Sequence, residues 1–212
     1  SGSLAVQADR LVLGDGEKAI AGFASTSLAA VDSVRSEGTG RLQVAGGLTI
    51  STPRVLAAGG SNQTVSAADN TQVDAPVYAG LSLTGSSASA SPAPSTASSE
   101  IELGGRLTLE GQRIDVATTV QARSGQITLS ARGTDEGDGI ELAAGALLDA
   151  RGQARNFNGR SAVADAGTVT LSAAAGPVAV RAGSMVDVSA ATEGGGAGQW
   201  VVQAESLALE GS

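Results

Sequence analysis

The chain has 212 residues, of which 42% are hydrophobic, so it is long and apolar enough for a folded core and is not a disordered tail. It contains no cysteine and no histidine, which excludes disulfides, thiol chemistry, the usual zinc ligands and the commonest general base. The net charge is −8 and the arginines are scattered singly, so no basic patch is available for nucleic acid.

The core must be built from small aliphatic side chains, because only Phe23, Tyr78, Phe157 and Trp200 are aromatic. Such a core is thin and regular. No apolar run approaches the ~18 to 20 residues of a membrane-spanning helix, and the N-terminal residues lack the pattern of a signal peptide. The first residues, Ser1-Gly2-Ser3, are typical of a cloning scar, so we expect the chain to be a piece of a longer protein.

The first part of the chain predicts short strands joined by glycine corners. "SLAVQADRLVLGDG" (3–16) matches "GQWVVQAESLALEG" (198–211) near the other end. The stretch 17–38 could be a helix, but Gly22 and its Ser/Thr clusters favour irregular strand. "GRLQVAGGLTIS" (40–51) resembles "GRLTLEGQRIDV" (105–116), each giving two five-residue strands and a corner.

Residues 85–99, "GSSASASPAPSTASS", form the one low-complexity stretch. Pro92 and Pro94 cannot donate to a strand ladder. Because the same repeat style resumes at Ile101, we expect a loop projecting from a single domain rather than a linker between two.

The second half of the chain contains an internal repeat. "GRLTLEG" (105–111), "GQITLSA" (125–131) and "GTVTLSA" (167–173) each place Gly before an apolar-Thr-apolar triplet. "IELAAGALLDAR" (140–151) and "VAVRAGSMVDVS" (178–189) align without gaps. The triplets are 20 and then 42 residues apart, so we expect residues 152–166 to be an extra loop.

A period of 20 to 25 residues that holds two or three strands predicts an all-β solenoid, in which each repeat is one turn and like residues stack about 4.8 Å apart. Trp200 should lie at an edge or under a loop. The sequence predicts two buried columns and one exposed column: Leu107, Ile127 and Val169; Leu109, Leu129 and Leu171; and, outside, Thr108, Thr128 and Thr170.

An antiparallel β-sandwich is the alternative fold, since it also has many short alternating strands. Its hairpins need Asn-Gly or Asp-Gly turns at regular intervals. Only "LGDGEK", "NFNGRS" and "DEGDGI" come close, and a sandwich leaves the repeat unexplained.

The units at 105–131 and 167–190 resemble the repeats of filamentous-haemagglutinin-type exoproteins, the large adhesins of bacterial two-partner secretion. The resemblance is strongest over 101–211 and weaker over 3–80. It implies a right-handed parallel β-helix, export through an outer-membrane barrel, and a rod secreted or displayed at the bacterial cell surface. The secretion domain of that family is not evident here, so this segment would be shaft.

Two acidic groups could carry chemistry. Asp135, Glu136 and Asp138 in "TDEGDG" could coordinate calcium, although a solvated loop explains them as well and no tandem of calcium-binding nonapeptides is present. Asp115, Asp149 and Asp187 are expected on outward strand positions, where a β-helical polysaccharide hydrolase or lyase would cluster its carboxylates. Stacked aspartates at a solvated surface repel by only roughly 1 kcal/mol and need no catalytic role.

Two further features could contact a ligand or carry a modification. The excursion "RGQARNFNGR" (151–160) combines Arg151, Arg155, Arg160, Asn156, Asn158 and Phe157, which could contact a receptor or glycan or simply cover the shaft. "NQT" at 62–64 is a short match to a glycosylation sequon.

The sequence therefore predicts a non-catalytic structural and adhesive shaft with no catalytic, cofactor or metal site. Its expected partners are a host or bacterial receptor or glycan and, for the longer protein, an export barrel. The alternatives are a β-helical carbohydrate-active enzyme and a phage or autotransporter β-helix. Terminal turns with unpaired strand edges should also associate end to end, unless loops cover them.

Overall fold

A computed structural model describes residues 2–69, 75–85, 103–157 and 160–210. These residues form strands and turns and contain no helix. Nearly all strand pairs are parallel, which excludes the antiparallel sandwich and confirms an all-β fold of stacked parallel strands. No helix in this part of the chain is long and apolar enough to cross a membrane.

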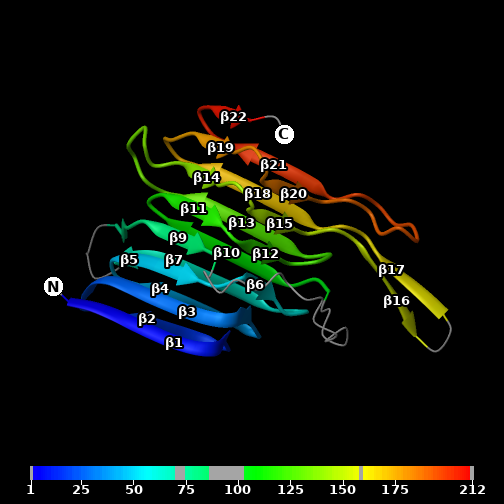
Figure 1. Cartoon of the computed structure of the whole chain (residues 1–212), viewed down its shortest axis with the longest axis horizontal. Helices are drawn as coiled ribbons and strands as arrows, with labels where there is room; N and C mark the ends of the chain where they lie inside the picture. Colours follow the sequence, from blue (N-terminus) through cyan, green and yellow to red (C-terminus); the bar gives the residue numbers. More distant parts are fainter. Residues whose placement is uncertain (1, 70–74, 86–102, 158–159, 211–212) are drawn as a thin grey trace.

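The strands form two large curled sheets and one hairpin (Figure 1). The 12-stranded sheet contains β1 (Gly2–Leu13), β3 (Phe23–Ser36), β5 (Gly47–Ser51), β6 (Arg54–Ala57), β9 (Leu81–Thr84), β11 (Ile114–Ala117), β12 (Thr119–Gln121), β14 (Ile140–Leu142), β15 (Leu147–Asp149), β19 (Val178–Val180), β20 (Met185–Asp187) and β22 (Leu207–Leu209). The 8-stranded sheet contains β2 (Gly16–Ile20), β4 (Thr39–Val44), β7 (Asn62–Asp69), β8 (Val77–Tyr78), β10 (Arg106–Gly111), β13 (Gln126–Ala131), β18 (Thr168–Ala173) and β21 (Gln199–Gln203). The hairpin is β16 (Gln153–Phe157) with β17 (Arg160–Ala164).

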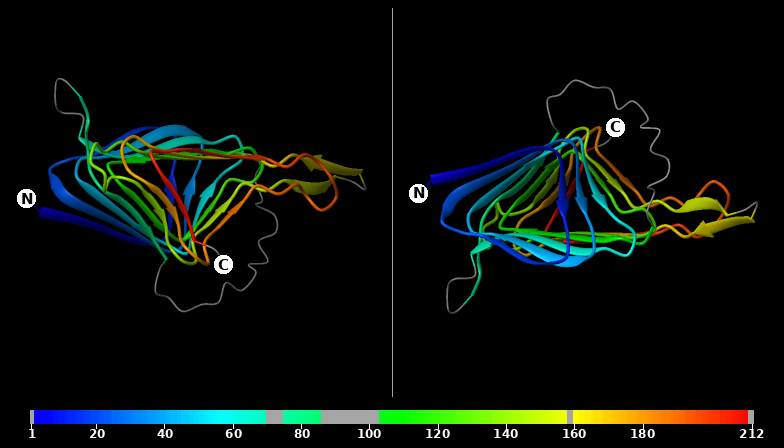
Figure 2. Two further views of the ribbon diagram at one scale, coloured as in Figure 1. Left: turned by 90° about the horizontal axis from the view of Figure 1, so that it is seen from above. Right: turned by 90° about the horizontal axis from the view of Figure 1, so that it is seen from below.

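The parallel strands fall into three stacks that the chain visits in a repeating order. The first stack is β2, β4, β7, β10, β13, β18 and β21. The second is the first half of β1 and of β3, followed by β5, β9, β11, β14, β19 and β22. The third is the second half of β1 and of β3, followed by β6, β12, β15 and β20. Figure 2 shows the three stacks as the sides of a roughly triangular outline.

The predicted columns are confirmed by the register of the first stack. Leu107 pairs with Ile127 and Ile127 with Val169, while Leu129 lies between Leu109 and Leu171. All six of these side chains are at most 1% exposed. Thr108, Thr128 and Thr170 form the outward column between them. Full burial of such an aliphatic side chain contributes roughly 1.5 to 3 kcal/mol, so the columns dominate the stability of the core.

The glycine that precedes each triplet packs backbone directly on backbone. Gly105, Gly125, Gly167 and Gly198 lie at the same corner of successive turns, and a Cβ on Gly125 would overlap the carbonyl oxygen of Gly105. A Cβ on Gly167 would overlap Gly125 in the same way. The repeated glycine is therefore a packing requirement of this corner.

One layer is missing from the third stack. β5, β9 and β11 follow one another in the second stack, whereas β6 pairs directly with β12 in the third. The Thr118 hydroxyl donates to the Thr52 carbonyl oxygen at 2.6 Å, and both residues are buried at this junction. The predicted loop at 85–99 falls between β9 and β10, and its residues 86–99 lie outside the described residues.

Residues 152–166, expected to form a loop, contain the antiparallel hairpin β16–β17 instead. Of the three hairpin signals in the sequence, only "NFNGRS" joins antiparallel neighbours. The Gly167 amide donates to the Ala150 carbonyl oxygen at 2.7 Å across the base of the hairpin. This hydrogen bond joins the end of the third stack directly to the start of the first, and the hairpin between them projects from that corner (Figure 2).

Two smaller expectations are also confirmed. Residues 17–38 form β2 and the 14-residue β3 rather than a helix. Trp200 lies in β21, the last strand of the first stack, where it is 39% exposed.

Candidate functional site

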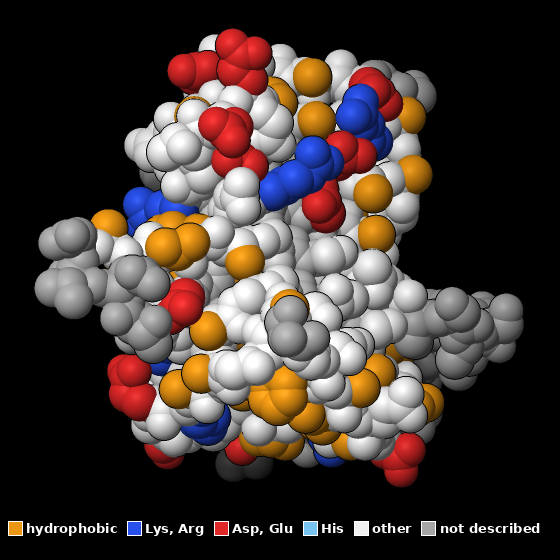
Figure 3. Space-filling model, turned by 90° about the vertical axis from the view of Figure 1, so that its left-hand side faces the viewer, with side chains coloured by type: hydrophobic (Ala, Val, Ile, Leu, Met, Phe, Trp, Pro, Cys, Tyr) orange, Lys and Arg blue, Asp and Glu red, His pale blue; other side chains and the backbone are white. Residues whose placement is uncertain are grey.

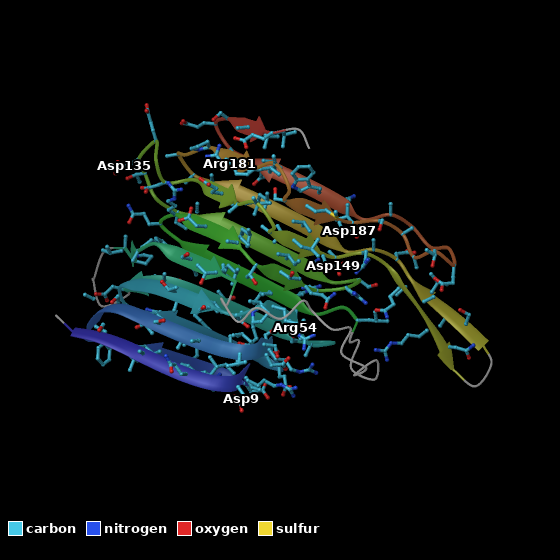
Figure 4. The ribbon with its side chains drawn as sticks, in the orientation of Figure 1. Asp9, Arg54, Asp135, Asp149, Arg181 and Asp187 are labelled. Atoms are coloured by element: carbon cyan, nitrogen blue, oxygen red, sulfur yellow. The ribbon has the colours of Figure 1, made fainter. Side chains whose placement is uncertain are left out.

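The structure brings two of the three candidate aspartates together. Asp149 of β15 and Asp187 of β20 are register partners in the third stack, and Figure 4 shows them on neighbouring strands. Asp115 of β11 lies in the second stack, where its register partner is Glu141. Asp149 and Asp187 therefore form a pair, and Asp115 lies apart from them in another stack.

Asp149 is not solvated, contrary to expectation, because its carboxylate is only 1% exposed. The Gln121 side-chain amide donates to Oδ2 at 2.7 Å, and Arg123 Nε and Arg151 Nη2 lie 3.3 and 3.2 Å from the same oxygen. The Arg151 backbone N–H donates to Oδ1 at 3.2 Å. Gln121 and Arg123 of the preceding turn, together with Arg151, thus cover an outward-facing carboxylate, and both of its oxygens accept hydrogen bonds.

Asp187 is held by its own corner. The Ser189 hydroxyl and backbone N–H donate to Oδ1 at 2.7 and 3.0 Å. These two hydrogen bonds, with the charge of Arg151, hold the pKa of Asp187 below its usual value. A general acid of a glycosidase needs a raised pKa, so Asp187 is suited to charge pairing and not to proton donation.

A ladder of alternating charges crosses the second stack. Arg113 pairs with Asp115 at 2.8 Å and with Glu141 at 3.2 Å. Arg181 pairs with the same Glu141 at 3.3 Å and with Glu210 at 2.6 Å. Figure 3 shows acidic and basic side chains alternating along a line on this side of the molecule. We call these five residues the charge ladder.

The pairings of Arg181 favour the ionised forms of Arg181 itself and of Glu210. The hydrogen bond from Arg181 holds the pKa of Glu210 below its usual value, and Glu141 is the main cause that raises the pKa of Arg181. The charge ladder therefore links β11, β14, the residue after β19 and the residue after β22, and each of its inner members lies between two opposite charges. Exposed pairs of this kind contribute little singly, but a network shares the ordering cost.

A smaller cluster ties the N-terminal turns. Asp32 lies between Arg10 and Arg54, at 3.1 and 2.7 Å. Burial works against ionisation of Asp32, but the hydrogen bonds from Arg54 and Arg10 outweigh it and hold its pKa below the usual value. Arg10 and Arg54 are each 22 residues from Asp32, so the sequence carries no local signal for these pairs. Such a signal exists for Arg113-x-Asp115 and Asp149-x-Arg151, because alternate residues share a strand face.

The acidic corner considered as a calcium site does not converge on one point. Asp138 is 8% exposed and accepts from the Gln112 side-chain amide at 3.0 Å and from the Asp135 backbone N–H at 3.2 Å. Asp135 and Glu136 are exposed. Within the described ranges, no three acidic side chains gather in a way that could hold a metal ion. Asp138 serves as an acceptor inside its own loop.

The arginine-bearing excursion projects from the described part of the column (Figure 2). Arg155 and Asn156 lie on β16, Arg160 begins β17, and the side chains of residues 157–160 lie outside the described part of the structure. The Asp165 carboxylate accepts from the Gly196 backbone N–H at 2.7 Å. This bond ties the loop 188–198 to the base of the hairpin, and both project in the same direction (Figure 2).

An open groove that the sequence did not signal lies on the N-terminal turns. Its volume is about 590 Å³, and it is lined by Gln7, Ala8, Asp9, Ala29, Ala30, Val31 and Ser51. It follows the bend at which β1 shifts register between Ala8 and Arg10. Small apolar side chains, the polar Gln7 and Ser51, and one carboxylate line it, with no aromatic platform for a sugar ring.

Comparison with known proteins finds no matching family model, no similar curated protein and no similar solved structure.

Proposed function

We propose that the chain is a non-catalytic shaft segment of a large secreted or surface-displayed bacterial adhesin, and that residues 1–212 form a single closed, right-handed parallel β-helix. The observation that carries this proposal is the in-register stacking of like residues in three stacks. A parallel crossover connection is right-handed in nearly all known cases, which supports the proposed hand. The Ala150–Gly167 hydrogen bond supports closure between the third and first stacks.

A shaft must resist bending and fraying while it holds other sites away from the cell. Each turn pairs only with its neighbours, so added stiffness has to come from contacts that run along the axis. The charge ladder and the Asp149–Asp187 pair with Arg151 run in that direction. Their carboxylates are engaged by arginines or hydroxyls, which supports a mechanical role over a catalytic one.

Deletion of one whole turn tests closure. Residues 105–124 form one 20-residue period, and Gly125 occupies the corner that Gly105 leaves. A closed solenoid lacking 105–124 should fold with the strand signal in circular dichroism retained. Deletion of 105–114 is the matched control, since half a turn destroys the register and should unfold the chain. Unfolding of both deletions would contradict a closed β-helix.

Adhesion itself is tested by binding of the purified chain to host and bacterial cells and to immobilised glycans. We expect binding without turnover, with the hairpin β16–β17 as the contact. Replacement of Arg155 by Ala should reduce such binding, whereas Arg106→Ala, an exposed arginine on the first stack, should not. Equal binding by both variants would remove the hairpin as the receptor or glycan contact.

A carbohydrate-active β-helical enzyme is the second candidate, favoured by the register pair Asp149 and Asp187. Assays of reducing-end release from plant and bacterial polysaccharides test it. Turnover that Asp187→Asn abolishes, in a variant that remains folded, would establish this function in place of the shaft.

A further inference from the structure

The inner columns change in chemistry along the chain. From Leu107 to Val186, every inner position on the described strands of the three stacks carries Leu, Ile, Val, Ala or Gly. The columns of the earlier turns contain polar side chains as well. Thr26, Ser36 and Gln63 lie at inner positions of the second, third and first stacks, and each is at most 1% exposed.

Thr26 is the least satisfied of these three residues. It lies between Leu4 and Leu48 in an otherwise aliphatic column. Its hydroxyl oxygen is buried, and no hydrogen-bond partner for it is found among the described residues. A hydroxyl that is removed from water without a new partner weakens the folded state, so the turn that holds Thr26 is less stable than its aliphatic neighbours.

Ser36 and Gln63 have partners, but they contribute less than aliphatic side chains would. The Ser36 hydroxyl donates to the Leu56 carbonyl oxygen at 3.3 Å, and the Gln63 amide donates to the carbonyl oxygens of Gly14 and Glu37. These hydrogen bonds replace hydrogen bonds to water. Each therefore stabilises the fold less than the burial of a leucine, such as Leu107 in the column of Gln63.

The two kinds of column meet at one junction. Residues 2–85 form the lower turns in Figure 1, and residues 103–210 form the turns above them. The two parts pair through β7 with β10, β9 with β11, and β6 with β12, at the level where the third stack lacks a layer. Because each turn of a solenoid is stabilised only by its neighbours, a junction of this kind can separate two units that open one at a time.

From this contrast we infer that the column opens in two steps, and that the turns of residues 2–85 open as one unit before the turns of residues 103–210. In a shaft under tension, the first unit lengthens while the second stays stacked, so the first unit is a yielding element. The two-step opening is a property of the chain itself, and only its mechanical use rests on the proposed shaft function.

Native-state hydrogen exchange of the intact chain, read on peptides by mass spectrometry, tests the order of opening. β4 and β7 are compared with β13 and β18, because each of these four strands has a stacked strand on both sides and is not at an end of the column. After correction for intrinsic exchange rates, the amides of β4 and β7 should exchange together and about tenfold or more faster than those of β13 and β18. Equal rates, or slower exchange in β4 and β7, would overturn the inference.

Thr26→Val tests the cause and the size of the unit. It removes the unpartnered hydroxyl and keeps the branched shape, so it should slow exchange in β4 and β7 about threefold or more and leave β13 and β18 unchanged. Thr49→Val, at an exposed outward position of β5, is the matched control and should change neither pair. Slower exchange confined to β3 would show that the turns open singly, which contradicts a common unit.

Val169→Thr is the reciprocal change, because it places a hydroxyl in the aliphatic column between Ile127 and Trp200. It should speed exchange in β13 and β18 about tenfold and leave β4 and β7 unchanged. Circular dichroism checks that the variants are folded, and unchanged exchange in β13 and β18 of folded Val169→Thr would overturn the inference. None of these measurements involves binding, so a chain that binds no cell or glycan would not affect them, and equal exchange rates would leave the shaft proposal standing.

Discussion

Asp149 and Asp187 are register partners on adjacent strands, yet their side chains are 1% and 19% exposed. The difference arises because Gln121, Arg123 and Arg151 enclose Asp149. A fully buried carboxylate with several charge-assisted partners contributes more to stability than a partly exposed one.

Asp149→Ala should therefore destabilise the protein by about 3 kcal/mol or more, because it leaves buried donors and an arginine without their acceptor. Asp115→Ala is the matched control. Its carboxylate is 44% exposed, so its loss should cost about 0 to 1 kcal/mol. Urea unfolding at neutral pH measures both, and equal losses would contradict the structural role of Asp149.

Stability should fall in acid and stay flat near neutrality. The pKa values of Asp32, Asp187 and Glu210 are lowered in the folded state. Their contribution to the free energy of unfolding is present above the unfolded-state pKa, about 4, and is lost as the pH falls through the lower folded-state values. The chain has no histidine to titrate between about pH 5.5 and 8.

Chemical unfolding from pH 8 to pH 2 measures this dependence. Ser189→Ala removes the hydroxyl that lowers the pKa of Asp187, so it should reduce the stability lost between pH 5 and pH 2. A stability maximum below pH 4 would contradict the assignment of these carboxylates.

The corner glycines should not tolerate even a methyl group. Gly125→Ala and Gly167→Ala each place a Cβ against the backbone of the preceding turn, which should cost about 1 to 3 kcal/mol. Gly137→Ala is the control, because no atom lies within 4 Å of the point that its Cβ would occupy, and it should change stability by less than about 0.5 kcal/mol. Thermal unfolding of the three variants tests this, and a stable Gly125→Ala would show that the turns can separate at the corner.

Gln63 occupies an inner position of the first stack, directly below Leu107, and is 1% exposed. Its side-chain amide donates to the carbonyl oxygens of Gly14 and Glu37 at 2.9 and 2.7 Å. Gln63→Leu extends the aliphatic column but removes the Gln63 donor from both carbonyl oxygens, of which that of Gly14 still accepts from Lys18 Nζ, so it should destabilise by about 1 to 3 kcal/mol. Gln203→Leu, at an exposed position of β21, should be nearly neutral, and a gain in stability for Gln63→Leu would mean that the column prefers an apolar residue there.

The sequence by itself determined the columns of the first stack and the glycine corners. Parallel in-register stacking places equivalent residues of successive turns on one another. The repeat alone therefore predicts the shared column of Leu107, Ile127 and Val169. The alternation around Thr128 likewise follows from the two-residue period of a strand. A local sequence pattern is sufficient to predict the contacts of a residue wherever its neighbour on the next turn is the equivalent residue of another repeat.

Only the tertiary structure decided which turns meet where the repeat is interrupted. The direct pairing of β6 with β12, the burial of Asp149 under Arg123 and the closing of residues 152–166 into a hairpin each depend on residues from non-equivalent positions. A sequence pattern reports the face on which a side chain lies. Whether that face is covered depends on long side chains and carbonyl groups from other turns, and these are brought together only when the turns stack.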